Sequence, residues 1–333
     1  MNMRNSIITI FALCLTASQC YGQTTKNRDS VQFARLTEAA IQNSILRQGA
    51  FSTEIVGSTT LDAKFNDNTL FKGKISMTRY RANFNLPVFQ FGKNTVALSF
   101  AYLQQQIKIN EVESFNPQLP MGDMTINRKT VTGTLSLVRI DSLFNKPVIF
   151  TANISGLSSK RSIQQVNLLG SITFVMKRTP TTSLSLGALI ILDPTSPLPI
   201  VPQIYYSHQF KTGGLQLIVD LPRRGLVRKA LSSKSFASFG TELSRTNAFL
   251  DIDNQFMPKV ANYSTLELRT GPTYEYRISK KIMLTVNGGL FTPLTSELKD
   301  KGSSKSFLSN KNGMSPYVDF SISILPFLKS IIK

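Results

Sequence analysis

Long stretches of alternating apolar and polar residues are the feature that most constrains the fold of this chain. Such alternation runs from Val166 to Lys177 and recurs near 96–102, 148–155, 184–190, 264–277 and 318–324. A period of two places successive side chains on opposite faces of a sheet. A soluble sandwich shows the same period, but several stretches here exceed ten residues, whereas globular strands average about 5–6. Strands that cross a bilayer need about 9–11 residues, so the pattern predicts an antiparallel transmembrane β-barrel.

The N-terminus has the order of regions found in secretory signal peptides. Arg4 precedes an apolar run from Ile7 to Leu15, and small and polar residues follow as far as Gly22. The run is about half the ~20 residues that a membrane-spanning helix needs, so residues 1–22 are predicted to be a cleaved signal. A lipoprotein signal at Cys20 is an alternative, but Gln19 is a poor residue for the position before a lipidated cysteine.

Cleavage after Gly22 would remove both cysteines of the chain, Cys14 and Cys20. The mature protein would then have no disulfide, thiol chemistry or cysteine metal site. No later segment has the ~18 consecutive apolar residues of a transmembrane helix. A barrel strand gives a much weaker hydropathy signal, so this absence does not argue against the predicted barrel.

The chain is strongly basic, with 38 Lys and Arg against 19 Asp and Glu and a net charge of +19. Clustered basic residues indicate nucleic-acid binding, but here they are scattered through the predicted strands, and we expect no nucleic-acid partner. The charge instead favours contact with anionic lipid headgroups, or a pore that prefers anions.

The connections between predicted strands sort by length. About fourteen strands are predicted, near 51–65, 70–84, 94–109, 128–140, 146–158, 164–177, 181–192, 201–210, 214–221, 225–232, 235–247, 263–277, 280–292 and 314–326. If the first strand rises from the periplasm, the periplasmic connections are nearly all short, at 85–93, 141–145, 178–180, 211–213, 233–234 and 279. The opposite set includes long polar loops at 110–127, 193–200, 248–262 and 293–313. This layout is typical of outer-membrane barrels.

One alternative changes the number of strands. Residues 217–231 could form one kinked strand with Pro222 at a bulge, and an even strand number would then be twelve. The predicted domains are a signal (1–22), a periplasmic lead-in segment (23–49), the barrel (50–328) and a short C-terminal tail (329–333). Helix-like spacing within 30–47 indicates partial order in the lead-in segment, which is favoured over a plug inside the lumen.

Several short motifs carry a family resemblance. They are Tyr21-Gly22-Gln23, the barrel start at Phe51-Ser52-Thr53-Glu54, the turn at Asn85-Leu86-Pro87 ahead of Gly92-Lys93, Leu221-Pro222-Arg223-Arg224, and a final strand from Pro316. Together they resemble a family of Bacteroidota-type outer-membrane barrels of unknown function, over roughly residues 49–327. The resemblance implies a barrel and its location, and no activity or catalytic residue. Such barrels often end on an aromatic residue that the assembly machinery reads, whereas here Phe327 is followed by a short tail.

Charged residues on inward strand phases are the candidate functional residues. They are Asp220, Glu242, Glu267, Arg269, Glu275, Arg277 and Asp319. Inward charges must be paired or hydrated, and Arg269 and Arg277 each follow a glutamate by two positions, so ion pairs that rigidify the lumen are the favoured interpretation. Pore tuning and catalysis by paired carboxylates are the alternatives. Asp251 and Asp253, in a predicted outer loop, are weak evidence for a cation site, and no metal or cofactor is predicted.

The single histidine gives little support to an enzyme. His208 shares the apolar phase of Ile204 and Tyr206, which favours a place in an interfacial aromatic belt. Ser207 points to the opposite face, so these two residues form a poor catalytic dyad, and no hydrolase, metalloprotease or phosphate-loop motif appears. We therefore expect no enzymatic activity.

Three functions remain open. The leading hypothesis is a passive, porin-like channel for small solutes, with a basic lumen that would favour anions. The alternatives are a closed barrel with a structural, adhesive or ligand-binding role through its outer loops, and an outer-membrane enzyme. The expected partners are outer-membrane lipid, lipopolysaccharide and the barrel-assembly machinery.

Overall fold

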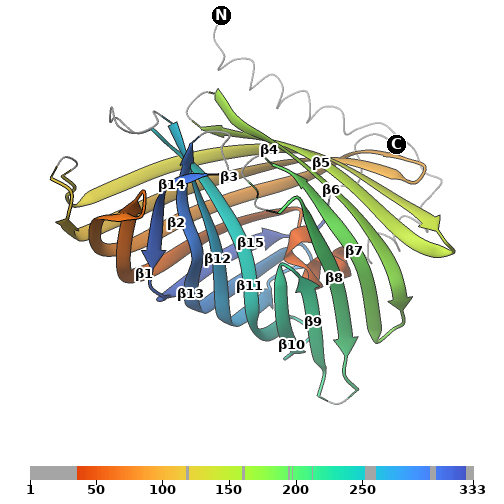
Figure 1. Cartoon of the computed structure of the whole chain (residues 1–333). Helices are drawn as coiled ribbons and strands as arrows, with labels where there is room; N and C mark the ends of the chain where they lie inside the picture. Colours follow the sequence, from red (N-terminus) through yellow and green to blue (C-terminus); the bar gives the residue numbers. More distant parts are fainter. Residues whose placement is uncertain are drawn as a thin grey trace, which may run out of the picture.

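The strands close into one antiparallel barrel (Figure 1). The computed structural model describes residues 36–117, 120–159, 162–193, 196, 198–211, 213–251, 260–300 and 305–327. The strands are β1 (Gly49–Phe65), β2 (Asn68–Phe91), β3 (Asn94–Ser114), β4 (Met124–Leu143), β5 (Lys146–Ser159), β6 (Ser162–Arg178), β7 (Thr182–Leu192), β8 (Ile200–Gln209), β9 (Leu215–Leu221), β10 (Arg224–Ala230), β11 (Ser235–Asp251), β12 (Val260–Arg277), β13 (Ile282–Asp300), β14 (Ser306–Asn312) and β15 (Ser315–Ile324). The predicted signal, the tail at 329–333 and Asp253 lie outside the described residues.

Fifteen segments fill fourteen positions in the sheet because β14 and β15 share the last one. β14 pairs with β1 from Leu61 to Phe65, and β15 pairs with β1 from Gly49 to Val56. Both segments also pair with β13, so they act as one strand interrupted at Gly313 and Met314. The prediction of fourteen strands is confirmed. The alternative of twelve is wrong, because Pro222 and Arg223 form a tight turn between two separate strands, with Asp220 paired to Arg224.

Two strands are longer than predicted, because they continue through prolines that the sequence analysis placed in connections. The expected connection at 85–93 is reduced to Gly92 and Lys93, because β2 continues through Pro87, where a register shift against β3 accommodates the ring. The expected outer loop at 293–313 is mostly strand, since β13 continues to Asp300 beyond a register shift beside Pro293. Local irregularities of this kind let a barrel strand contain a proline that sequence patterns interpret as a turn.

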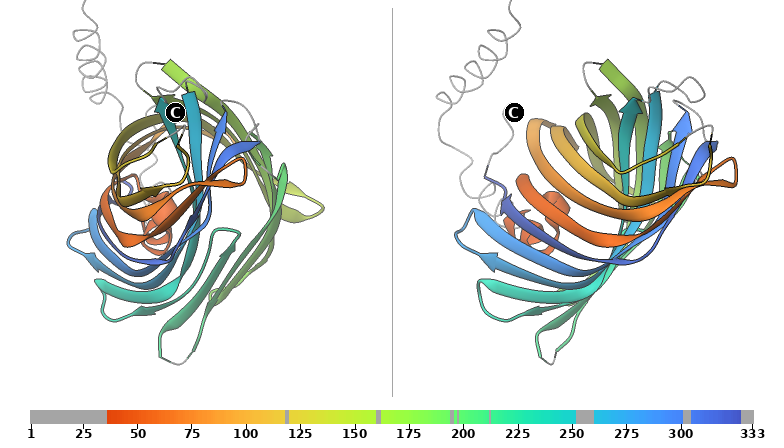
Figure 2. Two further views of the ribbon diagram at one scale, coloured as in Figure 1. Left: turned by 60° about the vertical axis from the view of Figure 1, so that its left-hand side comes forward. Right: turned by 90° about the vertical axis from the view of Figure 1, so that its left-hand side faces the viewer.

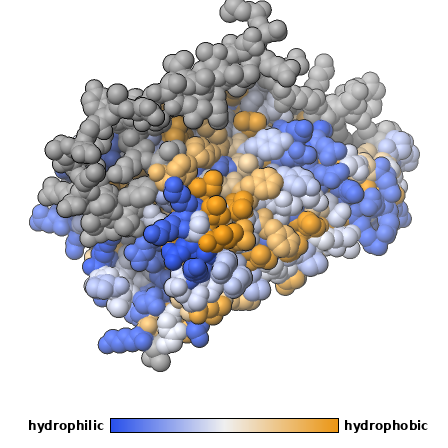
Figure 3. Space-filling model, turned by 180° about the vertical axis from the view of Figure 1, so that it is seen from behind, coloured by the Kyte–Doolittle hydropathy of each residue, from blue (hydrophilic) through white to orange (hydrophobic). Residues whose placement is uncertain are grey.

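The barrel has two ends, an entry end and a far end. The entry end is where the chain enters β1 at Gly49 and leaves β15 at Ile324, and the far end holds the turn between β1 and β2. The outward phase of the strands is apolar and exposed, as at Phe51, Ile55 and Phe320, and hydrophobic residues gather across the face seen in Figure 3. No helix among the described residues is long and apolar enough to cross a membrane.

The inward phase at the far end is apolar as well. Leu61, Leu70, Ile107, Leu298 and Leu308 belong to one buried cluster that joins β1–β3 to β11–β14. Such a cluster excludes water from the space between these strands. The far end is therefore a packed core over the described residues, and the space available for a ligand lies nearer the entry end.

A close approach between β12 and β13 depends on glycine. Gly289 has a φ of +144°, and a Cβ built on it would lie 2.1 Å from the carbonyl oxygen of Thr270. We expect Gly289→Ala to lower the free energy of unfolding by about 1–3 kcal/mol, because the backbone is strained for any other residue. Urea unfolding in detergent micelles measures this. Gly133→Ala is the matched control, since a Cβ there meets nothing within 4 Å; equal stability of the two variants would contradict the prediction.

Candidate functional site

A chamber of about 680 Å³ lies inside the barrel. Its walls come from the inward phases of β1–β5, β10–β13 and β15, and residues from the segment 36–48 form part of its lining. The charged lining residues are Arg47, Glu54, Arg81, Arg224, Arg228, Glu242, Arg245, Arg269, Glu275 and Asp319. Arginines outnumber carboxylates in this lining of described residues. The chamber therefore presents guanidinium groups to whatever enters it.

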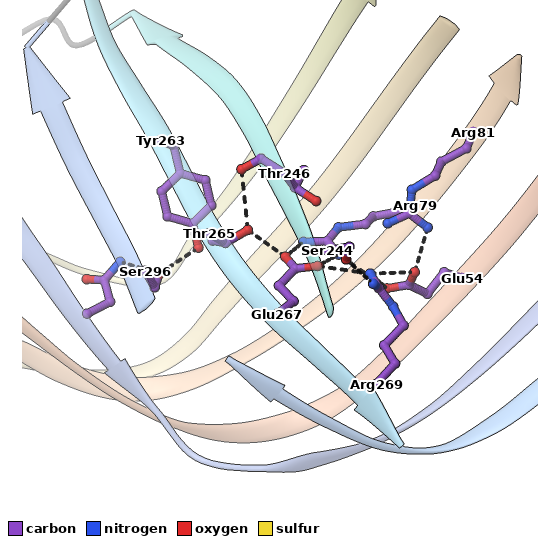
Figure 4. A network of polar contacts seen from close by, with 11 residues as sticks. Glu54, Arg79, Arg81, Ser244, Thr246, Tyr263, Thr265, Glu267, Arg269 and Ser296 are labelled. Carbon is purple, nitrogen blue, oxygen red and sulfur yellow. Dashed lines mark hydrogen bonds and ion pairs between the residues drawn. The ribbon is translucent and has the colours of Figure 1, made fainter. Parts of the chain in front are cut away.

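A buried ion network separates the chamber from the apolar core (Figure 4). Arg79 on β2 is fully buried; its Nη1 lies 3.2 Å from Glu54 Oε1 on β1 and 2.7 Å from Glu267 Oε2 on β12. Arg269 Nη2 lies 3.0 Å from Glu54 Oε2 and 2.9 Å from Glu267 Oε2. Buried charges are costly unless each is paired and hydrogen-bonded, and here strands from opposite ends of the barrel's sequence supply the partners.

Further contacts fix the same network. Arg81 Nη1 donates to Glu54 Oε2 at 2.5 Å, and Thr265 Oγ1 donates to Glu267 Oε1 at 2.5 Å. The guanidinium of Arg79 lies 5.6 Å from the ring centre of Phe291, which belongs to the apolar core. The network and the core together block the direct route from the chamber to the far end, over the described residues.

The N-terminal segment 36–48 blocks the entry end. It consists of a helix at 36–42 and the 3-10 turn η1 (Ser44–Leu46), and it lies inside the barrel in both views of Figure 2. Arg47 Nη1 donates to Thr285 Oγ1 at 3.2 Å and Ser323 Oγ at 3.1 Å, and its Nη2 forms an ion pair with Glu275. Ala40 is buried against Met283 and Leu325 at the same end.

Arginines of the β9–β10 hairpin hold the other side of this segment. Arg228 Nη2 donates to the carbonyl oxygen of Ile41 at 3.1 Å and lies 2.9 Å from Glu275 Oε2. Arg223 donates to Asn43 Oδ1 at 3.4 Å and to Ser44 Oγ at 3.3 Å. The sequence favoured a lead-in segment over a plug, whereas the described part lies within the lumen. A short segment suffices because inward arginine side chains already narrow the bore.

The predicted inward residues divide into three groups. Glu242, Arg269, Glu275 and Asp319 line the chamber. Glu267 lies behind the chamber in the ion network. Asp220 and Arg277 are not among the chamber's lining residues, because Asp220 pairs with Arg223 at the hairpin tip and Arg277 donates to the carbonyl oxygen of Ser233 at the exposed entry end.

Of the two ion pairs expected between a glutamate and the arginine two positions later, one is present. Glu267 pairs with Arg269, whereas Glu275 pairs with Arg47 and Arg228 in place of Arg277. Sequence reasoning did not single out Glu54, Arg79, Arg81, Arg224 and Arg228, although each lies on the inward phase of its strand. The same phase rule applied to β1, β2 and β10 would have found them.

His208 lies away from the chamber. Its Nδ1 is 2.8 Å from Thr182 Oγ1, and its ring lies between Tyr206 and Phe210, with ring centres 6.4 Å and 4.8 Å away. An aromatic cluster of this kind is typical of the interfacial belt of a membrane barrel.

The fold and its chamber define a closed, antiparallel fourteen-stranded β-barrel with an internal polar compartment. The chain belongs to the family described as "Domain of unknown function (DUF6268)", whose model matches residues 43–325. The unknown function of this family agrees with the resemblance found in the sequence. No curated protein matches the chain at a significant level.

Solved structures with a similar fold are outer-membrane barrels. They include an outer-membrane channel from Pseudomonas putida F1, with 12% identity, 84% of this chain and 95% of that chain covered, and a TM-score of 0.36. The Pseudomonas putida toluene transporter TodX gives 8% identity, 83% and 88% coverage, and a TM-score of 0.32. Pseudomonas putida OprB at low pH gives 10% identity, 85% and 96% coverage, and a TM-score of 0.27. These likenesses concern the fold alone.

Proposed function

We propose that this protein is an outer-membrane transport barrel that takes small anionic solutes into its arginine-lined chamber. The observation that carries the proposal is the chamber itself, a compartment of about 680 Å³ lined by more arginines than carboxylates and enclosed by the barrel. The segment 36–48 acts as a gate at the entry end, and the ion network with the apolar core beyond it is a second gate in series that must open for a solute to pass. The proposal thus replaces the passive channel expected from the sequence by a gated one, and it contains no catalytic step.

The exterior supports a place in the outer membrane. Outward residues such as Phe51, Leu135 and Phe239 are large, apolar and exposed, as a surface in contact with lipid requires. A soluble protein rarely exposes so extended an apolar surface. Outer-membrane lipid and lipopolysaccharide are the proposed surroundings of this surface, and the barrel-assembly machinery is the proposed partner in insertion.

Arg224 is the proposed first ligand of an anionic solute. It lines the chamber, and its side chain is 8% exposed. Its ion pair with Asp220 is long, at 3.7 Å, and its Nε has no hydrogen-bond partner among the described residues. A guanidinium with unused donors in a partly dry site binds carboxylate or phosphate groups strongly, because it can donate two parallel hydrogen bonds.

The experiment is a reversal-potential measurement under a salt gradient in a planar bilayer that contains the folded barrel. We expect a preference for anions that Arg224→Gln reduces, because the substitution removes one positive charge from the chamber. Arg139→Gln is the matched control, since Arg139 is an exposed arginine paired with Asp141 outside the chamber. A preference for cations, or no conductance from the intact or the gate-deleted protein, would refute the transport proposal.

A closed barrel that binds a ligand without transporting it is the second candidate, favoured by the obstruction at both ends of the chamber. Calorimetric titration with inorganic phosphate distinguishes the two functions. Binding that Arg224→Gln weakens, without any flux in the bilayer, would support the closed ligand-binding barrel in place of the transporter.

A further inference from the structure

The barrel wall is low at the β9–β10 hairpin. β9 and β10 have 7 residues each, whereas the adjacent strands β8 and β11 have 10 and 17. A seven-residue strand tilted by about 45° rises roughly 16 Å, less than the ~25 Å apolar band of an outer-membrane barrel. The last pairs are Ile204 with Leu221 and Arg224 with Glu242. Beyond them, no strand among the described residues pairs with these edges of β8 and β11, and Arg245 on β11 lies 3.7 Å from Asp193, which follows β7.

The chamber reaches this gap. Ser244, Arg245, Thr246 and Asn247 all line it, and all lie on β11 beyond its last pair with β10. These residues extend the lining of the chamber to the part of β11 that has no β10 residue beside it. The other edge of β11 is paired with β12 throughout these residues. The chamber therefore borders the edge of β11 that the short hairpin leaves without a partner.

The border of the gap is apolar on the outside. Ile200 and Ile204 on β8 and Leu221 at the hairpin tip are exposed outward-phase residues. Ile200 pairs with Ile190 on β7, and the exposed Leu192 continues the apolar phase beyond that level. The gap thus lies within the part of the wall that faces lipid, not above it.

The inner side of the gap combines apolar and cationic groups. In Figure 1, the N-terminal segment is visible between β8 and β11 above the hairpin, and Arg223 at the hairpin tip donates to Asn43 and Ser44 of that segment. Ile45, which lines the chamber, is 56% exposed, and Leu226 and Leu157 line it too. Arg224 and Arg245 stand among these residues.

We propose that the gap is a lateral window through which an amphipathic anion, an alkyl chain with a carboxylate or phosphate headgroup, enters the chamber from the lipid bilayer. The apolar border and Ile45 suit the alkyl chain, and Arg224 and Arg245 suit the headgroup. This inference rests on the proposed function, because it takes the chamber as the solute compartment, and it adds the substrate class and the route.

The chain has no tryptophan, so one introduced indole reports on one place. Leu226→Trp places the reporter in the chamber, and Val227→Trp places a matched reporter on the lipid-facing side of the same strand. The protein is reconstituted in phosphatidylcholine vesicles that contain a brominated fatty acid or a brominated phospholipid. We expect the fatty acid to quench both reporters equally, and the bulky phospholipid to quench only the reporter at 227.

A second variant closes the window. Two residues inserted on each side of the Pro222–Arg223 turn lengthen the hairpin so that it pairs further along β8 and β11. We expect this insertion to abolish quenching at 226 by the fatty acid, while the anion preference in the bilayer persists. Unchanged quenching, or no quenching at 226 in the uninserted barrel, would overturn the window. Loss of anion preference in the uninserted barrel would instead refute the proposed function.

Heat-modifiable migration on gels verifies that each variant is folded. If the insertion variant fails to fold, the comparison of quenching at positions 226 and 227 still decides whether the window exists.

Discussion

Arg79→Met is expected to lower the free energy of unfolding of the barrel by about 3–5 kcal/mol. The substitution keeps an unbranched side chain and removes the charge that faces both Glu54 and Glu267. These two glutamates are 1% and 0% exposed, so water cannot replace the lost partner. The penalty comes from leaving Glu267 with Arg269 as its one remaining cationic partner among the described residues, a partner that it shares with Glu54, in a site that water does not reach.

Urea unfolding in detergent micelles, followed by the loss of heat-modifiable migration on gels, measures the change. Lys74→Met is the control, because Lys74 and Glu111 form an exposed pair, and such pairs contribute about 0–1 kcal/mol. The double variant Arg79→Met, Glu267→Leu removes both charges of the central pair, and we expect it to recover most of the lost stability. A double variant less stable than Arg79→Met would show that packing, not charge pairing, governs this position.

The second large effect is expected on flux. Arg47→Met should raise the passage of small anions through the reconstituted barrel by about ten- to hundredfold. Arg47 makes two hydrogen bonds and an ion pair to the barrel wall. Hydrogen bonds to a charged group contribute about 1.5–3 kcal/mol each, and each 1.4 kcal/mol shifts an equilibrium about tenfold. Arg47→Met removes all three contacts, but water hydrates the wall groups when the segment leaves, so we expect a net loss equal to about one such bond, which favours release of the gate by this factor.

Single-channel conductance and chloride efflux from vesicles measure this prediction. Arg277→Met is the matched control, because Arg277 lies on the same strand as Glu275 but bonds to Ser233 at the exposed entry end. Deleting residues 36–46 should raise flux at least as much as Arg47→Met. Unchanged flux after the deletion, in a barrel that still folds, would show that the segment is not a gate.

The alternation of residues was sufficient to predict the barrel and its number of strands, because the pattern follows from which face meets lipid. Connections were harder to predict. Pro87 and Pro293 lie within strands because neighbouring register shifts accommodate them. No local sequence pattern predicts such a shift. The connections are therefore shorter than predicted, and more of the chain lies in the strands of the barrel wall.

The inward phase of Glu267 and Arg269 was also visible in the sequence, but their partners Glu54 and Arg79 lie more than 180 residues away in the chain. Only closure of the barrel brings β1 and β2 against β12, and no spacing rule encodes that contact. Arg47 likewise contacts residues far away in the chain, because its hydrogen-bond partners Thr285 and Ser323 lie on β13 and β15. The chamber depends on these long-range contacts, so the sequence indicated inward charges without showing the compartment they enclose.

The ion network has a consequence for how the barrel assembles. Its members belong to the first two strands and to β12, so no sheet that still lacks either edge can satisfy them. In a sheet that has not yet closed, Glu54 and Arg79 would be hydrated, and moving them into a dry interior without their partners would cost free energy. When the two edges of the sheet join, the ion-pair partners come together and this free-energy cost is removed in one step. We therefore expect the barrel to close in a single cooperative step, in which β1 and β2 take their final places only when the C-terminal strands are present.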